Sequence, residues 1–105
     1  MNKNTVEITL QGKEYNFSFN FLIIKNLQNA IKGLKVEDIF QRVADQDFNV
    51  ISELLYRGIK FNHPDFSRDI VDNLGFSDIE TVFVAIANLF GATMPTTKEV
   101  DVEGK

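Results

Sequence analysis

The sequence contains no cysteine, and this absence removes several kinds of chemistry. Without a thiol, the chain can form no disulfide, no thiolate metal site and no cysteine nucleophile. The lack of cysteine also fits a protein that is made and used in a reducing cytoplasm. Functions that depend on a cysteine thiol are therefore excluded for this sequence.

Basic charge and long apolar runs are scarce as well. The chain has 15 acidic and 11 basic side chains, which gives a net charge of -4. A nucleic-acid-binding protein needs a basic surface, so nucleic acid is disfavoured as a partner. No apolar run approaches the roughly 20 residues that span a bilayer. The first residues turn at once into an alternating pattern instead of a signal peptide, so we expect no membrane partner and a cytoplasmic protein.

Histidine occurs once, as His63, so any histidine-based catalysis would depend on this residue. Asp65 and Ser67 lie close to it in sequence, but such proximity does not make a catalytic triad. Pro64 follows directly, and the residue before a proline disfavours the α conformation. We interpret residues 62–65 as a joint between two helices. Just before this joint, Gly58 either allows another helix to approach closely or loosens the helix end.

A metal or phosphate site finds little support in the sequence. The stretch DQDFN at residues 45–49 resembles the start of a calcium-binding loop. Such a loop requires glycine at its sixth position and glutamate at its twelfth, where this sequence has Val50 and Tyr56. The six glycines are widely spaced and form no phosphate-binding pattern. We therefore expect no metal, no cofactor, no catalytic residue and no enzymatic activity.

Residues 5–19 show the two-residue alternation that predicts a β-hairpin. Its apolar positions are Val6, Ile8, Leu10, Tyr15, Phe17 and Phe19. Gln11 and Gly12 form a two-residue turn, in which Gly12 supplies a positive φ. The register that follows pairs Leu10 with Lys13, Ile8 with Tyr15, and Val6 with Phe17. An isolated hairpin is marginal in water, so its apolar face is expected to lie on helices.

The rest of the chain shows the helical period. Apolar residues recurring every three or four positions predict helices at about 21–32, 36–46, 48–60, 66–74 and 78–90. Asn20 and Asp47 are the expected caps of the first and third helices. Gly91 is expected to end the last helix, and a Ser77-to-Glu80 capping box to begin it. The predicted fold is α+β: one domain over 1–92, with the hairpin packed on about five helices, and a flexible tail over 93–105.

Phenylalanine is abundant, with ten copies and no tryptophan. A domain of this size has room for one modest core, so some of these rings could face a partner. The last predicted helix is apolar nearly all round, which is typical of a central core helix or of a helix that also forms an interface. Both interpretations remain open from the sequence. The candidate partner-binding residues are Phe76, Val82, Phe83, Ile86 and Phe90.

The sequence resembles a known family at two places. The stretch TVEITLQGKEYNF at residues 5–17 is similar to the "strand, G-K-E-Y, strand" opening of tail assembly chaperones from long-tailed phages and prophages of Gram-positive bacteria. Residues 21–31 match the Phe/Leu-rich helix that follows in that family. Residues 54–60 and the Asn-His-Pro at 62–64 are similar to the joint after a later helix. The resemblance covers about residues 5–90.

This resemblance implies a role in assembly. The family's proteins coat the long, helical, hydrophobic tape measure protein and keep it soluble until tail-tube subunits polymerise around it. The implied partners are a tape measure protein, further copies of the chain itself and, in addition, a tail tube protein. The implied location is the cytoplasm of the bacterial host and not the mature virion. The alternative is a small structural or adaptor component that stays in the phage particle.

Overall fold

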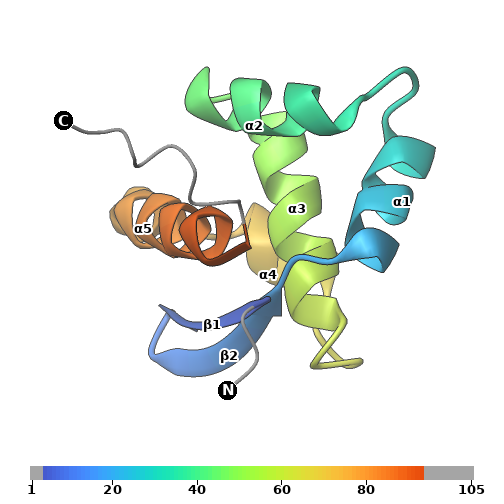
Figure 1. The fold of residues 1–105 in the computed structure, drawn as a ribbon. Coiled ribbons are helices and arrows are strands. Elements are labelled where there is room, and N and C mark those ends of the chain that lie inside the picture. Colours follow the sequence, from blue (N-terminus) through green and yellow to red (C-terminus); the bar gives the residue numbers. More distant parts are fainter. Residues whose placement is uncertain (1–3, 94–105) are drawn as a thin grey trace, which may run out of the picture.

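The computed structural model describes residues 4–93 and confirms the α+β class (Figure 1). Its elements are β1 (Thr5–Leu10), β2 (Lys13–Ser18), α1 (Phe21–Ala30), α2 (Val36–Ala44), α3 (Phe48–Lys60), α4 (Arg68–Asp72) and α5 (Phe76–Thr93). The predicted tail over 93–105 lies outside the described residues except for Thr93, which is helical and so does not belong to a tail.

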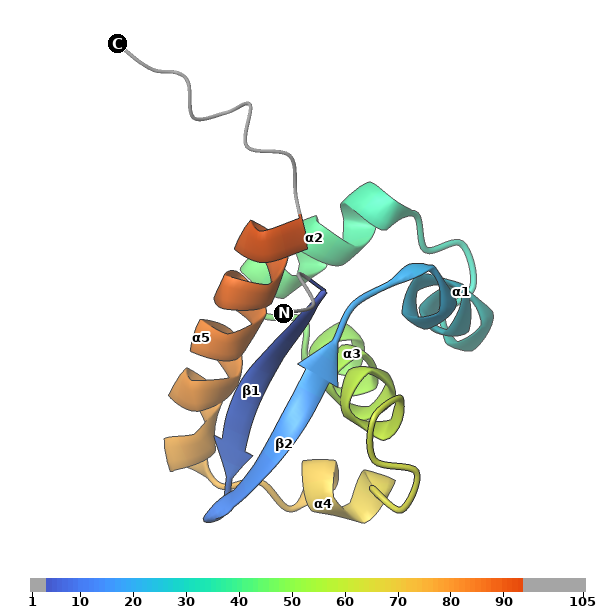
Figure 2. The ribbon, with the colours of Figure 1, turned by 60° about the horizontal axis from the view of Figure 1, so that its bottom comes forward.

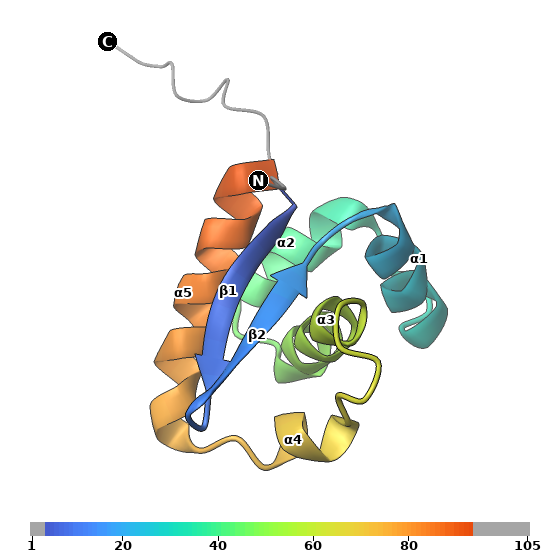
Figure 3. The same ribbon diagram turned by 90° about the horizontal axis from the view of Figure 1, so that it is seen from below.

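The hairpin lies across one side of the helices, as Figures 2 and 3 show. β1 runs beside α5, and β2 lies against α3. α3 occupies the centre, where it contacts α1, α2 and α4. α1 and α5 lie on opposite sides of α3 (Figure 1). The hairpin therefore joins α3 and α5 into one unit with a shared core.

The hairpin register matches the prediction at all three predicted pairs. The turn uses two residues with positive φ, Gln11 at 53° and Gly12 at 82°, although only Gly12 was expected to do so. Two successive positive φ values define a turn whose twist matches that of the flanking strands. The alternation then places one face of the hairpin in the core, where Ile8, Leu10, Tyr15 and Phe17 are buried.

The core is continuous from the hairpin to α5. Its largest fully buried apolar side chains are Phe17, Leu10, Ile23, Leu27, Ile39, Leu54, Leu55, Ile59, Ile86, Leu89 and Val50. Full burial of one such side chain stabilises the fold by about 1.5–3 kcal/mol. Because α1, α2, α3 and α5 all contribute to this list, the helices depend on one another and on the hairpin for their stability.

Gly58 allows the closest contact between the hairpin and α3. A Cβ atom at this position would lie 2.4 Å from a ring carbon of Phe17 and 2.6 Å from the backbone oxygen of Ser18. Real Cβ atoms do not come this close to other heavy atoms. Gly58 therefore permits a close approach, as one of the two sequence interpretations proposed, but the approaching element is β2 and not a helix.

The segment after α3 is a joint, as predicted, and it also holds the outer edge of β2. The side-chain amide of Asn62 donates to the backbone oxygen of Asn16 at 3.0 Å and to the hydroxyl of Ser18 at 2.8 Å. The backbone N–H of Asn16 donates to Nε2 of His63 at 2.8 Å. The His63 ring also packs edge-on against Tyr15. The lone histidine therefore has a structural role in fixing β2.

Asn62→Ala is expected to lower the free energy of unfolding by about 1–3 kcal/mol, because it removes two hydrogen bonds: the one to the backbone oxygen of Asn16 and one of the two made by the buried hydroxyl of Ser18, which also bonds to Thr5. Urea unfolding followed by circular dichroism measures the change. Asn29→Ala is the matched control, since Asn29 is exposed on α1. The control should stay within about 0.5 kcal/mol of the unsubstituted chain. Equal unfolding midpoints for the two variants would contradict this role for Asn62.

Some helix boundaries differ from the prediction, and α2 shows why. It ends at Ala44 instead of 46 because Gln46 adopts a left-handed φ of 64°. The N–H of Asp47 then donates to the backbone oxygen of Arg42, and the N–H of Gln46 donates to the backbone oxygen of Val43. This pair of bonds is the Schellman arrangement, which usually has glycine at the left-handed position. A glutamine there gives no sequence signal for a helix end.

The boundaries of α5 were also predicted incorrectly. Ser77 lies inside the helix and does not begin it. The carboxylate of Asp78 instead accepts a hydrogen bond from the N–H of Gly75 at 2.9 Å, which satisfies a free donor at the helix start. At the other end the helix continues through Gly91 to Thr93. An exposed glycine inside a helix weakens it without ending it.

The remaining helices agree more closely with the sequence. α3 has the predicted bounds, and both predicted caps form: Asn20 accepts from the N–H of Ile23 and Asp47 from that of Asn49, each at 3.0 Å. α1 ends at Ala30, two residues early, and α4 is shorter than the predicted 66–74. The residues flanking α4 form turns instead, so this segment connects α3 to α5 more than it adds to the helical layer.

Candidate partner-binding surface

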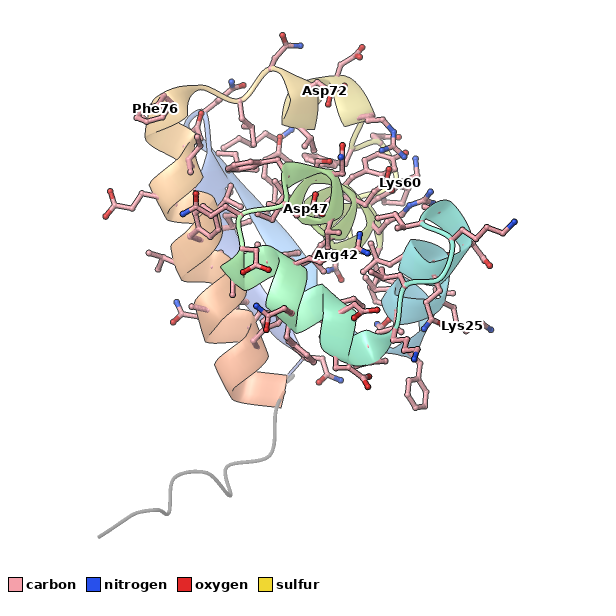
Figure 4. The ribbon with its side chains drawn as sticks, turned by 90° about the horizontal axis from the view of Figure 1, so that it is seen from above. Lys25, Arg42, Asp47, Lys60, Asp72 and Phe76 are labelled. Carbon is pink, nitrogen blue, oxygen red and sulfur yellow. The ribbon has the colours of Figure 1, made fainter. Side chains whose placement is uncertain are left out.

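α5 has one face in the core and one face on the surface. The buried face consists of Val82, Ala85, Ile86 and Leu89, which recur at helical spacing and are 6% exposed or less. The opposite face carries Phe76, which is 89% exposed, and Val84, which is 52% exposed. Figure 4 shows Phe76 at the start of α5, at the periphery of the molecule. The helix is therefore both a core helix and an apolar surface.

The surface of α5 forms a shallow hollow of about 620 Å³, which we name the α5 groove. Its lining residues are Gln46, Phe76, Ser77, Ile79, Glu80, Phe83, Val84 and Ala87. Phe48, which is 48% exposed at the start of α3, packs edge-on against Phe83 with 6.1 Å between the ring centres. Glu80 is the one charged residue among these lining residues. The groove is thus a largely apolar surface that extends from α5 to the start of α3.

The five residues predicted as a partner surface do not lie together. Phe76 and Phe83 line the groove. Val82 and Ile86 are 6% and 2% exposed and face the core, so they are not available to a partner in this conformation. Phe90 is half-buried, with its ring 4.6 Å from that of Phe40. Of the predicted set, only Phe76 and Phe83 therefore belong to the exposed surface of α5.

Sequence reasoning did not select the remaining groove residues. Ile79, Val84 and Ala87 are apolar positions of α5, but little in a helix that is apolar nearly all round distinguishes its inner from its outer stripe. Phe48 belongs to a different helix, α3, so helical spacing along α5 does not connect it to this surface. The one available signal was the acidic Glu80, which marks the solvent side of α5 and hence the side on which the groove lies.

A second group of exposed apolar residues lies at the start of α1. Phe21 is 84% exposed and Leu22 is 49% exposed. α1 and α5 lie on opposite sides of α3, so this group is separate from the α5 groove (Figures 1 and 4). The start of α1 is therefore an apolar surface distinct from the α5 groove.

The polar residues considered for chemistry have structural partners. Asp47 caps α3 and forms a 3.7 Å ion pair with Arg42 (Figure 4). Asp45 accepts a hydrogen bond from Gln41. Among the residues that the structure describes, no group of three or more histidine, aspartate or glutamate side chains is placed to hold a metal ion. These carboxylates therefore contribute to helix ends.

Charged residues also connect α3 to α4. Glu53 accepts hydrogen bonds from Arg57 and Arg68, and the bond to Glu53 raises the pKa of Arg68 above its ordinary value. The guanidinium of Arg68 also lies 4.3 Å from the ring centre of Tyr56. The guanidinium of Arg68 therefore stays charged at any physiological pH. The cluster thus links α3 to the start of α4.

Comparisons with protein-family models, curated proteins and solved structures found no match to this chain. Across residues 4–93, no helix combines the length and the apolar character needed to cross a membrane. The most distinctive feature of the described residues is an exposed aromatic groove on a helix whose other side is core.

Proposed function

We propose that this protein is a tail assembly chaperone that binds apolar helical segments of a tape measure protein and keeps them soluble during tail assembly. The α5 groove carries the proposal, because it presents an almost fully exposed Phe76 beside Phe83 and Val84. Contiguous exposed apolar residues mark binding sites in soluble proteins. The hairpin opening, which resembles that of this chaperone family, supports the same role.

The shape of the groove suits a helical partner. The groove follows α5 from Phe76 to Ala87, which corresponds to about 18 Å of helix. An amphipathic helix can lie in such a groove with its apolar stripe against the aromatic side chains. Glu80 at the groove and the net charge of -4 favour basic residues at the edge of the partner's apolar stripe. The proposed substrate is thus an apolar helix flanked by basic residues.

The apolar surface at the start of α1 gives the proposal a second part. A tape measure protein is long, so many chaperone copies bind along it, and contacts between neighbouring copies add avidity to weak individual binding. α1, which begins with Phe21 and Leu22, lies on the other side of α3 from α5 (Figure 1), so these residues can contact a neighbouring copy while the groove is occupied. We include self-association through this surface in the proposed function.

Co-expression with the tape measure protein of the same phage or prophage tests the function. We expect the tape measure protein to become soluble and to elute in a complex with this chain on size-exclusion chromatography. An unchanged soluble fraction and separate elution would rule the chaperone role out. Mass spectrometry of purified particles is the second measurement. Stoichiometric amounts of this chain in virions would identify a structural or adaptor component instead.

A further inference from the structure

The two edges of the hairpin differ in how their backbone groups are satisfied. On β2, the N–H and the backbone oxygen of Asn16 point away from β1 and bond to His63 and Asn62. Asn16 is paired with Glu7 in the register. In an antiparallel pair, residues whose backbone groups point outward lie opposite one another. The N–H and the backbone oxygen of Glu7 therefore point away from β2, and those of Thr9 do the same.

The outer edge of β1 is open. Within residues 4–93, nothing outside the hairpin forms a hydrogen bond with the backbone of Glu7 or Thr9. Both residues are exposed. Natural proteins usually cover or blunt such an edge, because an unpaired strand accepts another strand. Within the described residues, the joint after α3 covers the edge of β2, whereas no backbone hydrogen bond covers the edge of β1.

A hollow runs along this open edge. It has a volume of about 350 Å³ and lies between β1 and α5, and we name it the β1 groove. It is lined by Glu7, Ile8, Thr9, Glu80, Thr81, Val84, Ala85 and Asn88. Val84 supplies exposed apolar surface, and Glu7 and Glu80 supply negative charge. The hollow therefore combines free backbone groups, an apolar wall and two carboxylates beside one strand.

We propose that the β1 groove binds an extended segment of a partner protein, which pairs with β1 as a third strand. The backbone of the segment bonds to the outward N–H and oxygen atoms of Glu7 and Thr9. Side chains of a strand alternate between two sides, so alternate residues of the segment face Val84 and α5. Basic residues of the segment lie near Glu7 and Glu80. The partner is thus an extended segment that alternates apolar and basic residues.

Charge distinguishes this occupant from two others. A second copy of the chain would bring its own Glu7 to an edge that already carries Glu7 and Glu80, and like charges across a strand pair are destabilising. Residues 94–105 contain two lysines and three acidic side chains, so they do not complement the groove either. A basic segment from another protein replaces this repulsion with attraction.

The inference is separate from the proposed chaperone function, because it concerns a strand that binds to backbone groups and not a helix that binds to aromatic rings. The two grooves share Glu80 and Val84. A partner bound in the α5 groove therefore affects access to the β1 groove, and the reverse also holds.

Amide hydrogen exchange of the full chain, measured by NMR at low salt, tests the inference. The probe is a short end-blocked peptide of alternating lysine and valine. We expect it to slow exchange at the amides of Glu7 and Thr9. Two matched peptides should not do so: one with glutamate in place of lysine, and one with every backbone amide N-methylated. Equal binding of the N-methylated peptide, protection confined to other residues, or no binding would each overturn the inference.

The free chain provides a further check. If Glu7 and Thr9 are already protected at every protein concentration, another part of the chain such as residues 94–105 occupies the edge, and the inference is wrong. If their protection increases with protein concentration, a second copy occupies it, and the inference is again wrong. Fast exchange in the free chain at all concentrations is the expected result.

Charge reversal tests the recognition of basic residues. Glu7→Lys combined with Glu80→Lys should weaken binding of the lysine–valine peptide about tenfold. Asp65→Lys combined with Asp72→Lys changes the net charge equally at exposed positions near α4, and should change binding by no more than about twofold. Equal weakening by the two double variants would show attraction to net charge alone and would overturn the site.

Discussion

Gly58→Ala is expected to lower the free energy of unfolding by about 3 kcal/mol or more. The added methyl group would lie 2.4 Å from the ring of Phe17 and 2.6 Å from the backbone oxygen of Ser18. Domains of this size are stable by about 5–15 kcal/mol, so the loss is a large fraction of the total. Urea unfolding followed by circular dichroism measures it, with reduced soluble yield as a second indication.

The location of the clash makes relief difficult. Phe17 is fully buried between the hairpin and the helices, so its ring cannot move into solvent. The oxygen of Ser18 belongs to the backbone of β2, which Asn62 and His63 hold from the joint. We expect Phe17→Ala to leave Gly58→Ala unrescued, because the clash with the backbone remains and a cavity is added.

Gly91→Ala is the matched control for this prediction. Gly91 is also inside a helix, but it is exposed and a Cβ atom there would meet nothing within 4 Å. Alanine favours the helical conformation over glycine by about 1 kcal/mol, so this variant should unfold at a slightly higher urea concentration. If both substitutions shift stability in the same direction, the close approach of β2 to α3 is not the reason that position 58 is glycine.

The hairpin and α3 could be predicted because their signals are local. The alternation over residues 5–19 and the two-residue turn together allow one register that gathers the apolar residues on one face. The helical period and the Asp47 cap define the start of α3 in the same way. Each of these elements is determined by residues within a few positions of one another.

The joint and the orientation of α5 depend on contacts between distant residues. Asn62 and His63 were recognised as a break between helices, but their bonds to Asn16 join positions more than 40 residues apart. Sequence periodicity does not report such pairs. α5 presents a similar difficulty, because its apolar residues surround the helix and its packing against β1 and the rest of the core decides that Val82 and Ile86 are buried.

Phe76→Glu combined with Val84→Glu is expected to weaken binding of a tape measure helix about 100-fold. Loss of an exposed aromatic anchor such as Phe76 removes about 2 kcal/mol or more of binding free energy, and the two new carboxylates would lose their hydration against the apolar stripe of the partner helix. Both positions are more than half exposed in the free protein. The same variant should therefore keep its free energy of unfolding within about 1 kcal/mol.

Phe21→Glu is the control that separates the α5 groove from exposed aromatic surface in general. Phe21 is 84% exposed, close to the 89% of Phe76, but it lies on α1 at the other side of α3. Titration of a single fluorescently labelled tape measure helix, followed by anisotropy, measures binding without a contribution from avidity. We expect Phe21→Glu to bind as the unsubstituted chain does. A binding site on α5 predicts a loss of affinity for the groove variant but not for Phe21→Glu. Equal losses for the two variants would therefore mean that binding depends on the total exposed apolar area and not on the α5 groove.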